Sequence, residues 1–392
     1  MTADIARPVR RRPKDRKRQI LLAAARAFSE RGYHPVGVDE IAAEVGISGP
    51  ALYRHFPNKY ALLVAVAENS AQTMMDVAAA ADSDAEPAQR LHDILAALSA
   101  MCIENRRGGG LYRWERRYLE REDRRRIRKL FDGTFARIEA PLALLRPGLP
   151  ADDVMLISRA LLSAVASISA HRTTLSNPRI EAVLAEICAS VTMVDLPAPD
   201  PGPAAPETGL AVTARRERLL TVALQIFAAR GYHEASIDEI ATAAGLTPSS
   251  VYRYFDSKAA LLSAAFYRAS DQVAVSLSRA LGESSAAAEA ISRVAQRFLA
   301  WSFANPEMAQ VYFAEFGNLP AEEQSRLRAA QRDNVDEWVN LLVELGCEPV
   351  VARFRVHAAF SIGLDIGQVV RFDRRPATLA RTHALIMGAL RA

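Results

Sequence analysis

The sequence predicts an all-α protein made of two tandem copies of one helical unit. When one half is shifted by 199 residues it aligns with the other without a gap, and residues 28–63 and 227–262 are identical at 17 of 36 positions. Both halves continue with long helical periods of apolar residues and almost no alternating β-branched runs. Between the copies, residues 195–213 contain five prolines and two glycines, a composition typical of an extended linker.

The length and composition fit a globular protein with two domains. The chain has 392 residues, of which 50% are hydrophobic and 24% charged, so each half is expected to bury a core of its own. No apolar run approaches the roughly 18 residues that a membrane span needs, and the basic N-terminus lacks the apolar stretch of a signal peptide. These features predict a cytoplasmic protein.

The spacing of the cysteines indicates neither a disulfide framework nor a metal site. Cys102, Cys188 and Cys347 stand far apart on apolar helical patterns, without a CxxC pair or a histidine at metal-ligand spacing. They are expected to be small core residues in a reducing compartment. We therefore predict neither a metal nor a cofactor.

Positive charge is concentrated near the N-terminus. The net charge is +4, yet residues 1–195 carry 29 basic and 24 acidic side chains, against 20 and 21 in residues 196–392. Within residues 7–18, eight of twelve side chains are basic, which suits binding to a polyanion, although a solvated tail explains the run as well. The members that we assign to DNA contact are Arg10, Arg11, Arg12, Lys14 and Arg16.

The repeated segment has the pattern of a helix-turn-helix. Apolar residues at helical spacing predict a first helix that ends at Gly32, where a glycine permits a left-handed cap. A second helix begins near Asp39, and in the second copy Ser236 and Glu239 form the sequence pattern of a capping box at its start. The first copy has Gly37 at the capping position, so its cap is expected to be weaker by roughly a few tenths of a kcal/mol.

A glycine turn then leads into a third helix of about two turns, and this arrangement suits the reading of a DNA duplex. Ser48 and Thr247 stand at its start, where hydroxyls and helix amides can bind phosphate. Pro248 takes the favoured first helical position in the second copy. Arg54 and Arg253 lie on the side opposite the apolar residues, where an arginine can reach guanine in the major groove.

Both copies resemble the N-terminal DNA-binding domain of TetR-family repressors. The shared pattern is Gly-Tyr, Ile-Ala, then Leu-Tyr-x-x-Phe-x-x-Lys-x-x-Leu; it runs from Gly32 to Leu62 and, with valine for the first leucine, from Gly231 to Leu261. The phosphate contacts that the resemblance implies are those of Tyr53, His55 and Lys59, and of Tyr252, Tyr254 and Lys258. The base contacts that it implies are those of Gly49, Pro50 and Arg54, and of Pro248, Ser249 and Arg253.

Two features depart from the commonest pattern of this family. Ala51 stands where a threonine is frequent, which removes one phosphate-binding hydroxyl from the first copy, whereas Ser250 keeps a hydroxyl in the second. Most family members are single units that dimerise, whereas this chain holds two units. An asymmetric pair of DNA-reading surfaces is therefore expected.

The resemblance also implies a helical C-terminal region in each copy that binds a small, often apolar ligand and supplies a dimer interface. Aromatic residues suggest a pocket, although core packing explains most of them. The candidate ligand-binding residues are Trp301, Tyr312, Phe313 and Phe316 in the second copy, and Tyr112, Arg113 and Trp114 in the first. An alternative is an anionic, acyl-CoA-like effector held by Arg106, Arg107 and Arg113.

The last helices of each copy, expected at residues 152–193 and 349–390, carry small residues that permit close helix crossing. We expect a four-helix interface there, through Ala160, Ala164, Ser167, Ile168, Phe360, Gly363, Ile366 and Gly367. One chain then folds as a pseudo-twofold dimer, because the linker replaces a bimolecular association by an intramolecular one. The alternative is that two chains still dimerise and present four DNA-binding units.

These expectations divide the chain into six segments. They are a basic arm (1–15), a first helix-turn-helix domain (16–64), a first C-terminal domain (65–194), a linker (195–213), a second helix-turn-helix domain (214–263) and a second C-terminal domain (264–392).

The predicted function is sequence-specific regulation of transcription by a ligand-responsive, nucleoid-associated repressor that binds a double-stranded DNA operator. The alternative is a ligand- or protein-binding module in which one helix-turn-helix no longer binds DNA. No nucleophile with a base, paired carboxylates or phosphate-binding glycine loop supports an enzyme.

Overall fold

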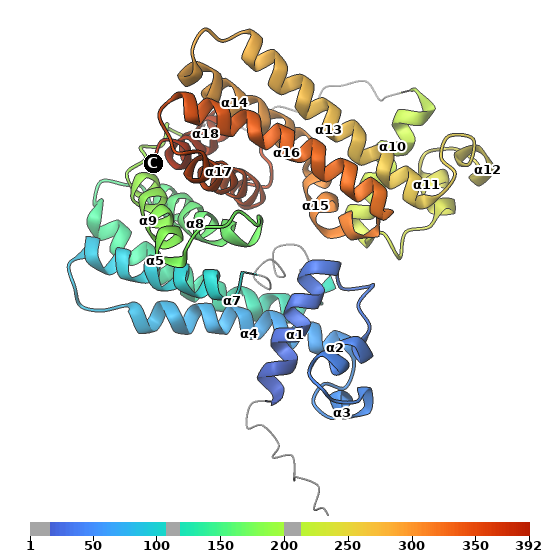
Figure 1. Ribbon diagram of the computed structural model, residues 1–392, viewed down its shortest axis with the longest axis horizontal. Helices are drawn as coiled ribbons and strands as arrows, with labels where there is room; N and C mark the ends of the chain where they lie inside the picture. Colours follow the sequence, from blue (N-terminus) through green and yellow to red (C-terminus); the bar gives the residue numbers. More distant parts are fainter. Residues whose placement is uncertain (1–15, 107–117, 200–212) are drawn as a thin grey trace, which may run out of the picture.

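The computed structural model describes residues 16–106, 118–199 and 213–392, and these residues form helices joined by turns, with no strand among them (Figure 1). The all-α prediction is therefore confirmed. The predicted arm residues Arg10, Arg11, Arg12 and Lys14, and the ligand candidates Tyr112, Arg113 and Trp114, lie outside the described residues. Within the described ranges, no helix is long and apolar enough to cross a membrane.

The first half begins with a small three-helix unit, here called the first head (residues 16–64), which continues into longer helices. Its helices are α1 (Arg16–Arg31), α2 (Val38–Glu44), α3 (Gly49–Tyr53), α4 (Lys59–Ala81), α5 (Pro87–Glu104), α7 (Arg121–Leu145), α8 (Ala151–Ala166) and α9 (Asn177–Thr192). A short 3-10 turn, η2 (Ser167–Ser169), extends α8.

The second half repeats this order, beginning with the second head (residues 214–263). Its helices are α10 (Arg215–Arg230), α11 (Ile237–Ala243), α12 (Pro248–Val251), α13 (Lys258–Gly282), α14 (Ala287–Ala304), α15 (Pro306–Glu315), α16 (Ala321–Glu344), α17 (Pro349–Val369) and α18 (Pro376–Leu390), with the 3-10 turn η3 (Phe316–Asn318) after α15. The tandem architecture that the sequence predicts is therefore present.

Each head is continuous with its C-terminal region through one long helix. The expected boundaries after residues 64 and 263 fall inside α4 and α13, which begin in the heads at Lys59 and Lys258 and extend to Ala81 and Gly282. A helix of this length is stiff, so a tilt of α4 or α13 moves the attached head as a body.

The buried apolar residues form three clusters, and this differs from the expectation of one core for each half. Each head has a small core of its own, built around Phe28 in the first and Phe227 in the second. The two C-terminal regions instead share one core, in which Leu161 of α8 and Ile362 of α17 are both fully buried. The halves are joined because the last helices of each bury their apolar sides against the other.

The interface between the halves is formed by α8 and α9 against α17 and α18, as the sequence predicted. Polar groups cross it at several buried points. Arg381 of α18 donates to the carboxylate of Asp153 in α8 at 2.5 Å, and both residues are only 6% exposed. Ser163 donates to Asp365 at 2.6 Å, and Ser190 donates to the carbonyl of Gly388 at 2.7 Å.

Three of the expected interface residues lie elsewhere. Phe360 packs on Phe298, at 4.9 Å between ring centroids, and so faces the interior of its own half. A Cβ on Gly363 would meet Ile386 and one on Gly367 would meet Phe372, both within the second half. The expectation was wrong for these three positions because a small residue indicates close packing but not which neighbour is packed. Ala160, Ala164, Ser167, Ile168 and Ile366 are buried as expected.

A stacked pair of histidines lies inside the interface. The rings of His171, which follows η2, and His357, on α17, are parallel to within 6° with centroids 4.3 Å apart. Burial lowers the pKa of both imidazoles, and the guanidinium groups of Arg353 and Arg106 lower them further; the pKa of His357 falls to about 4. Both rings are therefore neutral in the folded protein at neutral pH.

We predict that the folded protein loses stability as the pH falls from 7 to 5. The unfolded histidines bind protons below their ordinary pKa of about 6.5, whereas the folded pair stays neutral until the pH approaches its depressed pKa, so acid favours unfolding by roughly 2 kcal/mol for His357 over this range. Urea unfolding at both pH values measures the effect. His357→Phe should flatten the dependence, whereas His92→Phe, at an exposed position, should leave it unchanged.

Candidate functional site

The helix-turn-helix forms in both heads through the local signals that the sequence carries. α1 and α10 end at Gly32 and Gly231, whose φ values of +83° and +87° require the left-handed region that glycine tolerates. In the second head, the Ser236 hydroxyl accepts from the amide of Glu239 at 3.1 Å, whereas Gly37 makes no side-chain cap. The capping box is only half formed, because the Glu239 carboxylate pairs with Arg230 instead, at 2.7 Å.

The third helix is shorter than the expected two turns in each head, at five residues in α3 and four in α12. Pro248 occupies the first helical position of α12 as predicted. The chain then reverses into α4 and α13, where Asn58 and Ser257 cap the next helix by accepting the amides of Ala61 and Ala260. The start of the next helix so soon after α3 and α12 leaves room for little more than one turn.

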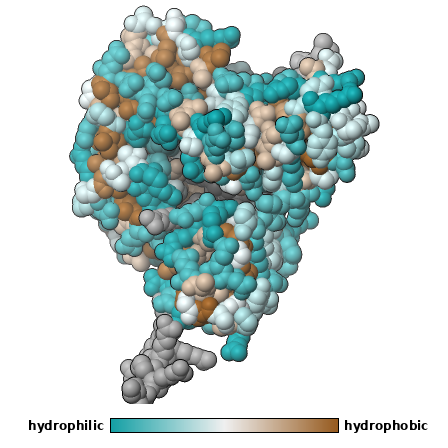
Figure 2. All heavy atoms as spheres, turned by 45° about the vertical axis from the view of Figure 1, so that its right-hand side comes forward, coloured by the Kyte–Doolittle hydropathy of each residue, from teal (hydrophilic) through white to brown (hydrophobic). Residues whose placement is uncertain are grey.

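The side chains predicted to read DNA lie on the outside of α3 and α12. Tyr53 is 48% exposed, Tyr252 54% and Tyr254 41%, so these side chains are not part of the buried core. The other exposed members of the two predicted sets are Ser48, Pro50, Arg54 and His55 in the first head, and Thr247, Pro248, Ser249 and Arg253 in the second. Polar side chains also cover most of the molecular face in Figure 2.

Gly49 differs from the expectation that it faces the bases. It is buried at the start of α3, and a Cβ at this position would lie 1.9 Å from a carboxylate oxygen of Asp39. Its lack of a side chain therefore serves the packing of α3 against α2, not an exposed contact. The second head has Pro248 at the aligned position, so the third helix starts differently in the two heads.

The hydroxyl groups at the start of the third helix also differ between the heads. In the second head, Thr247 lies within hydrogen-bond distance of Ser249 and Ser250, at 3.0 and 2.8 Å. In the first head the aligned positions are Ser48, Pro50 and Ala51, and Ser48 makes no side-chain cap. The second head therefore presents a cluster of three hydroxyls where the first presents one.

Lys59 and Lys258 have a structural role that the sequence analysis missed. The ammonium group of Lys258 donates to the carbonyls of Tyr232 and Ala235, at 2.6 and 2.8 Å, and lies 4.5 Å from the Tyr232 ring centroid. Lys59 donates to the His34 carbonyl at 2.9 Å and lies over the Tyr33 ring. Burial lowers the pKa of Lys258. Each lysine ties its helix to the preceding α1–α2 or α10–α11 loop.

Arg16 likewise serves the head itself. Its guanidinium donates to the carbonyl of Val45, in the turn before α3, at 2.6 Å. The next residue, Lys17, lies over the ring of Phe56, and Arg216 lies over Phe255 in the second head. The starts of α1 and α10 are thus held against the loops that follow α3 and α12.

The two heads touch each other through the loops that follow α1 and α10. The rings of His34 and His233 lie 5.4 Å apart, and His34 also packs edge-on against Tyr118, at 4.7 Å. Both histidines therefore take part in packing contacts. α3 and α12 lie at the outer ends of the heads, away from this contact (Figure 1).

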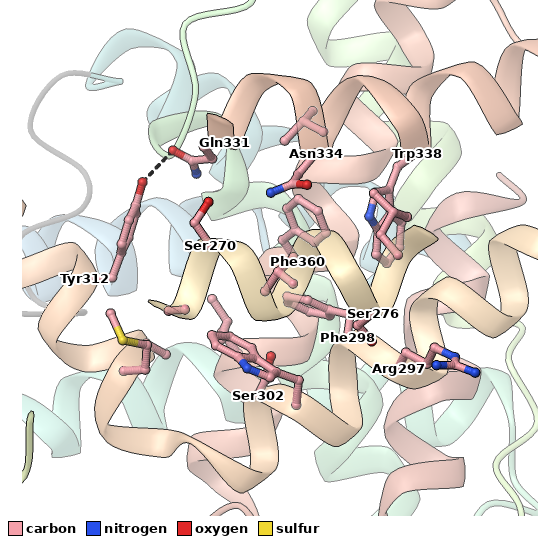
Figure 3. Close-up of a pocket in the computed structure, with 18 of the residues that line it drawn as sticks. Ser270, Ser276, Arg297, Phe298, Ser302, Tyr312, Gln331, Asn334, Trp338 and Phe360 are labelled. Carbon is pink, nitrogen blue, oxygen red and sulfur yellow. Dashed lines mark hydrogen bonds between the residues drawn. The ribbon is translucent and has the colours of Figure 1, made fainter. Parts of the chain in front are cut away.

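A separate cavity of about 180 Å³ lies in the C-terminal region of the second half (Figure 3). Aliphatic and aromatic side chains form most of its wall, and its lining includes Phe298, Trp301, Tyr312, Gln331, Asn334 and Trp338. Tyr312 donates to Gln331 at 2.7 Å, and Trp301 donates to Gln272 at 3.0 Å. Arg297, at the edge of the cavity, pairs with Glu283 at 2.6 Å. The cavity is apolar with a few uncharged polar groups.

Two of the predicted ligand residues, Trp301 and Tyr312, line this cavity. Phe316 packs on Tyr312 at 5.2 Å, just behind the wall. Phe313 lies in α15, and its side chain is outside the described part of the structure. Of the arginines considered for an anionic effector, Arg106 is engaged elsewhere, donating to the carbonyls of Ile168 and His171 at 2.8 Å, whereas Arg107 lies outside the described residues.

Comparison with known families matches the model of the bacterial regulatory proteins of the tetR family to residues 20–66 and again to residues 219–265. Each half of the chain carries a TetR-family DNA-binding domain. The two TetR matches coincide with the heads and with the start of α4 and α13. This confirms the prediction that a TetR-type segment occurs twice, in tandem, in this chain.

Curated relatives resemble part of the chain. The transcriptional activator FasR of Mycolicibacterium smegmatis is 44% identical over 66 residues, or 17% of this chain and 30% of FasR. The nucleoid occlusion factor SlmA of Pasteurella multocida is 34% identical over 91 residues, or 23% of this chain and 46% of SlmA. The chain thus spans less than half the length of either relative.

Solved structures also align with the chain. A TetR-family transcriptional regulator from Bordetella parapertussis aligns with 45% of this chain and 95% of its own, at 23% identity and a TM-score of 0.40.

We predict that Lys258→Ala destabilises the second head, because it removes three hydrogen bonds to carbonyls of the α10–α11 loop, one of them long at 3.5 Å; the expected loss is about 1 kcal/mol for this half-buried group. Thermal unfolding followed by circular dichroism measures the change. Arg253→Ala removes an exposed cation from the same head and should leave the midpoint unchanged. Equal midpoints for both variants would contradict the anchoring role of Lys258.

Proposed function

We propose that the chain regulates transcription by binding one DNA operator with both heads, and that an apolar molecule in the cavity of the second half relieves this binding. The observation that carries the proposal is that each head exposes a tyrosine and an arginine at the end of the third helix of a TetR-type helix-turn-helix. Exposed arginine on a short reading helix is the side chain that most often recognises guanine. The relatives include a transcriptional activator, FasR, so DNA binding by itself does not decide between repression and activation.

Phosphate binding is proposed for Tyr53, His55 and Ser48 in the first head and for Tyr252, Tyr254, Thr247 and Ser250 in the second, with Pro50, Pro248 and Ser249 beside the bases. All lie on or beside α3 and α12, where helix amides add to the attraction for an anion. Lys59 and Lys258 remain candidates for phosphate contact through any hydrogen that their carbonyl partners do not use.

A pseudo-dimeric chain is the oligomeric state that we propose. It is supported by the shared core of the C-terminal regions and by the buried ion pair of Asp153 and Arg381, which join the halves within one chain. Arg381 also donates to the carbonyl of Pro197 at 2.7 Å, so the beginning of the linker is held at the same interface.

The proposed effector is an uncharged, largely apolar small molecule. The cavity offers aromatic surface with the amides of Gln331 and Asn334 and the hydroxyl of Tyr312, and the nearby Arg297 is already paired with Glu283. Such a site favours a molecule that buries apolar surface, and a few hydrogen bonds orient that molecule. It offers little to the phosphates of a coenzyme A thioester.

We predict that both heads contribute to the recognition of one duplex selected from a random pool. Arg54→Ala and Arg253→Ala should each weaken discrimination at a different half-site, by about 1–3 kcal/mol if the arginine pairs with guanine. Fluorescence anisotropy with single-base variants of the duplex measures this. Arg326→Ala, in an exposed ion pair on α16, is the matched control. Loss of binding from one head with no effect from the other would favour a chain with one functional head.

We predict a species near 42.8 kDa, the mass of one chain, in sedimentation of the free protein and a 1:1 complex with the selected duplex. The four interface helices already bury their apolar sides against each other within the chain, which is the contact that two separate subunits would otherwise make. A species of twice this mass that persists on dilution would contradict the pseudo-dimer.

We predict that the neutral dye N-phenyl-1-naphthylamine binds the cavity with increased fluorescence and lowers affinity for the duplex. Ala269→Phe fills the cavity, since Ala269 is buried in its wall, and should abolish dye binding. Ala274→Phe places the same ring on an exposed position of the same helix and should bind dye as the wild type does. Equal dye binding by both variants would show that the dye lies elsewhere.

A further inference from the structure

We propose that the first turns of α7 bind the phosphate backbone of the spacer, the stretch of duplex between the two half-sites, through a cationic stripe that the second half lacks. The stripe is defined as four basic side chains on one exposed side of this helix, Arg121, Arg125, Arg128 and Lys129. The inference rests on the proposed binding of one duplex by both heads. It adds a third DNA-contacting surface, which only the first half supplies.

The four side chains of the stripe are exposed and lie along one side of α7. Their spacing of four, three and one residues places them opposite the buried Ile127, Thr134 and Ile138. At a rise of about 1.5 Å per residue the stripe is about 12 Å long. Each strand of a duplex carries one phosphate for about every 3.4 Å of the helix axis, so the stripe matches the length of about three phosphates.

The charge of the stripe is not neutralised by its surroundings. Asp123 and Glu68 pair with Arg126, which lies outside the stripe, at 2.8 and 2.9 Å. Within the described parts of the chain, no stripe side chain forms an ion pair with a carboxylate. Residues 121–132 contain six basic and three acidic side chains, so positive charge predominates there. An exposed surface of this kind attracts a polyanion.

The stripe is fixed to the first head. Leu119, just before α7, and Ile127 within it are buried in the core of that head. The hydroxyl of Tyr60, in the first turn of α4, donates to the Asp123 carboxylate at 2.7 Å and accepts from the amide of Glu120 at 2.9 Å. Only five residues separate the end of α3 from the start of α4, and α7 runs beside α4 from the first head (Figure 1). A duplex bound by α3 therefore passes close to the start of α7.

The start of α7 also lies beside the contact between the two heads. Tyr118, three residues before Arg121, packs edge-on against His34 at 4.7 Å between ring centroids. A Cβ on Gly231 of the second head would lie 2.9 Å from the Tyr118 hydroxyl. Because α3 and α12 lie at the outer ends of the heads, a duplex that reaches both of them passes this contact between its half-sites (Figure 1). The stripe is therefore assigned to the spacer and not to the DNA beyond the half-sites.

The second half has no equivalent of the stripe. The aligned positions of α16 are Ala321, Ser325, Arg328 and Ala329, of which one is basic. Arg328 lies over the ring of Phe316, at 5.1 Å from its centroid, and so packs against its own half. The duplication has thus left positive charge on one side of the contact between the heads, and the spacer is bound from the side of the first head.

A contact of this kind strengthens binding without reading sequence. Phosphates carry no base information, so the stripe adds affinity and fixes the position of the duplex, whereas Arg54 and Arg253 discriminate between bases. Each phosphate neutralised by a basic side chain releases counterions and adds about 0.9 to the slope of log affinity against log salt concentration. The stripe and the base-reading arginines therefore differ in the quantity that their removal changes.

Salt titration of the full chain with the selected duplex tests the stripe. The combined variant Arg125→Gln, Arg128→Gln and Lys129→Gln should lower the magnitude of the salt slope by about 2–3. The matched control removes the same charge from exposed positions of the second half, through Arg279→Gln, Arg332→Gln and Arg391→Gln, and should change the slope by less than about 0.5, since salt screens distant charges.

A charge-conserving variant separates a lost contact from an altered fold. Arg125→Lys combined with Arg128→Lys keeps the positive charge of the stripe and should keep the salt slope of the wild type, because a lysine also neutralises a phosphate. The glutamine variant replaces exposed side chains by another helix-forming residue and should keep the thermal midpoint of the wild type.

Neutral linkages in the DNA locate the contact. Methylphosphonate linkages across the spacer should weaken binding of the wild-type chain by about tenfold or more, because they remove the charged acceptors of the stripe. The glutamine variant should bind the neutral-spacer duplex and the ordinary duplex with affinities within about twofold of each other, as expected when the two changes remove one interaction. Methylphosphonates outside the half-sites should affect the wild type and the glutamine variant alike.

The outcomes separate the stripe from the binding of DNA by the heads. Equal salt slopes for the glutamine variant and its control would overturn the stripe and leave binding by the two heads in place. A glutamine variant that remains as sensitive to the neutral spacer as the wild type would overturn the assignment of the stripe to the spacer. Failure of the wild-type chain to select any duplex would contradict the proposed function and the stripe with it.

Discussion

The packing of α8 and α9 against α17 and α18 is the contact on which the rest of the arrangement depends. It merges the C-terminal regions of the two halves into one hydrophobic core, and its buried polar groups are matched across the interface, as with Asp153 and Arg381. An unpaired charge at such a site would cost several kcal/mol, so the pairing strongly favours one register of the helices. The position of each head follows, because α4 and α13 extend from this core.

The duplication frees the halves to differ, and the structure shows differences at each functional level. In the first head, α3 begins with a buried glycine that packs against Asp39. In the second head, α12 begins with a proline, and the serines that follow it form a cluster of hydroxyls with Thr247. In the C-terminal region, polar residues line a cavity in α16 where α7 has apolar or internally bonded ones. A homodimer cannot diverge in this way, because both of its subunits carry every substitution.

Several residues combine a role expected from sequence with one that appears only in the fold. Lys59 and Lys258 match the family position associated with phosphate, yet they hold the loops that contact the other head. Phe360, Gly363 and Gly367 carry the small or apolar character expected of an interface, yet they pack within their own half. In each case the residue type predicted the kind of contact but not the residue that would be contacted. A side chain favours a kind of contact, and the fold decides which neighbour makes it.

The sequence by itself determined the tandem repeat, the all-α class, the location of each helix-turn-helix and most of its exposed residues, because these depend on signals between near neighbours. A helical period, a glycine at positive φ and a capping serine act within a few residues of their own position. Only the tertiary structure decided the shared core, the histidine stack, the cavity in the second half and the contact between the heads. These depend on which of several apolar helix surfaces meet across more than a hundred residues, and such a choice is made by packing complementarity over the whole molecule.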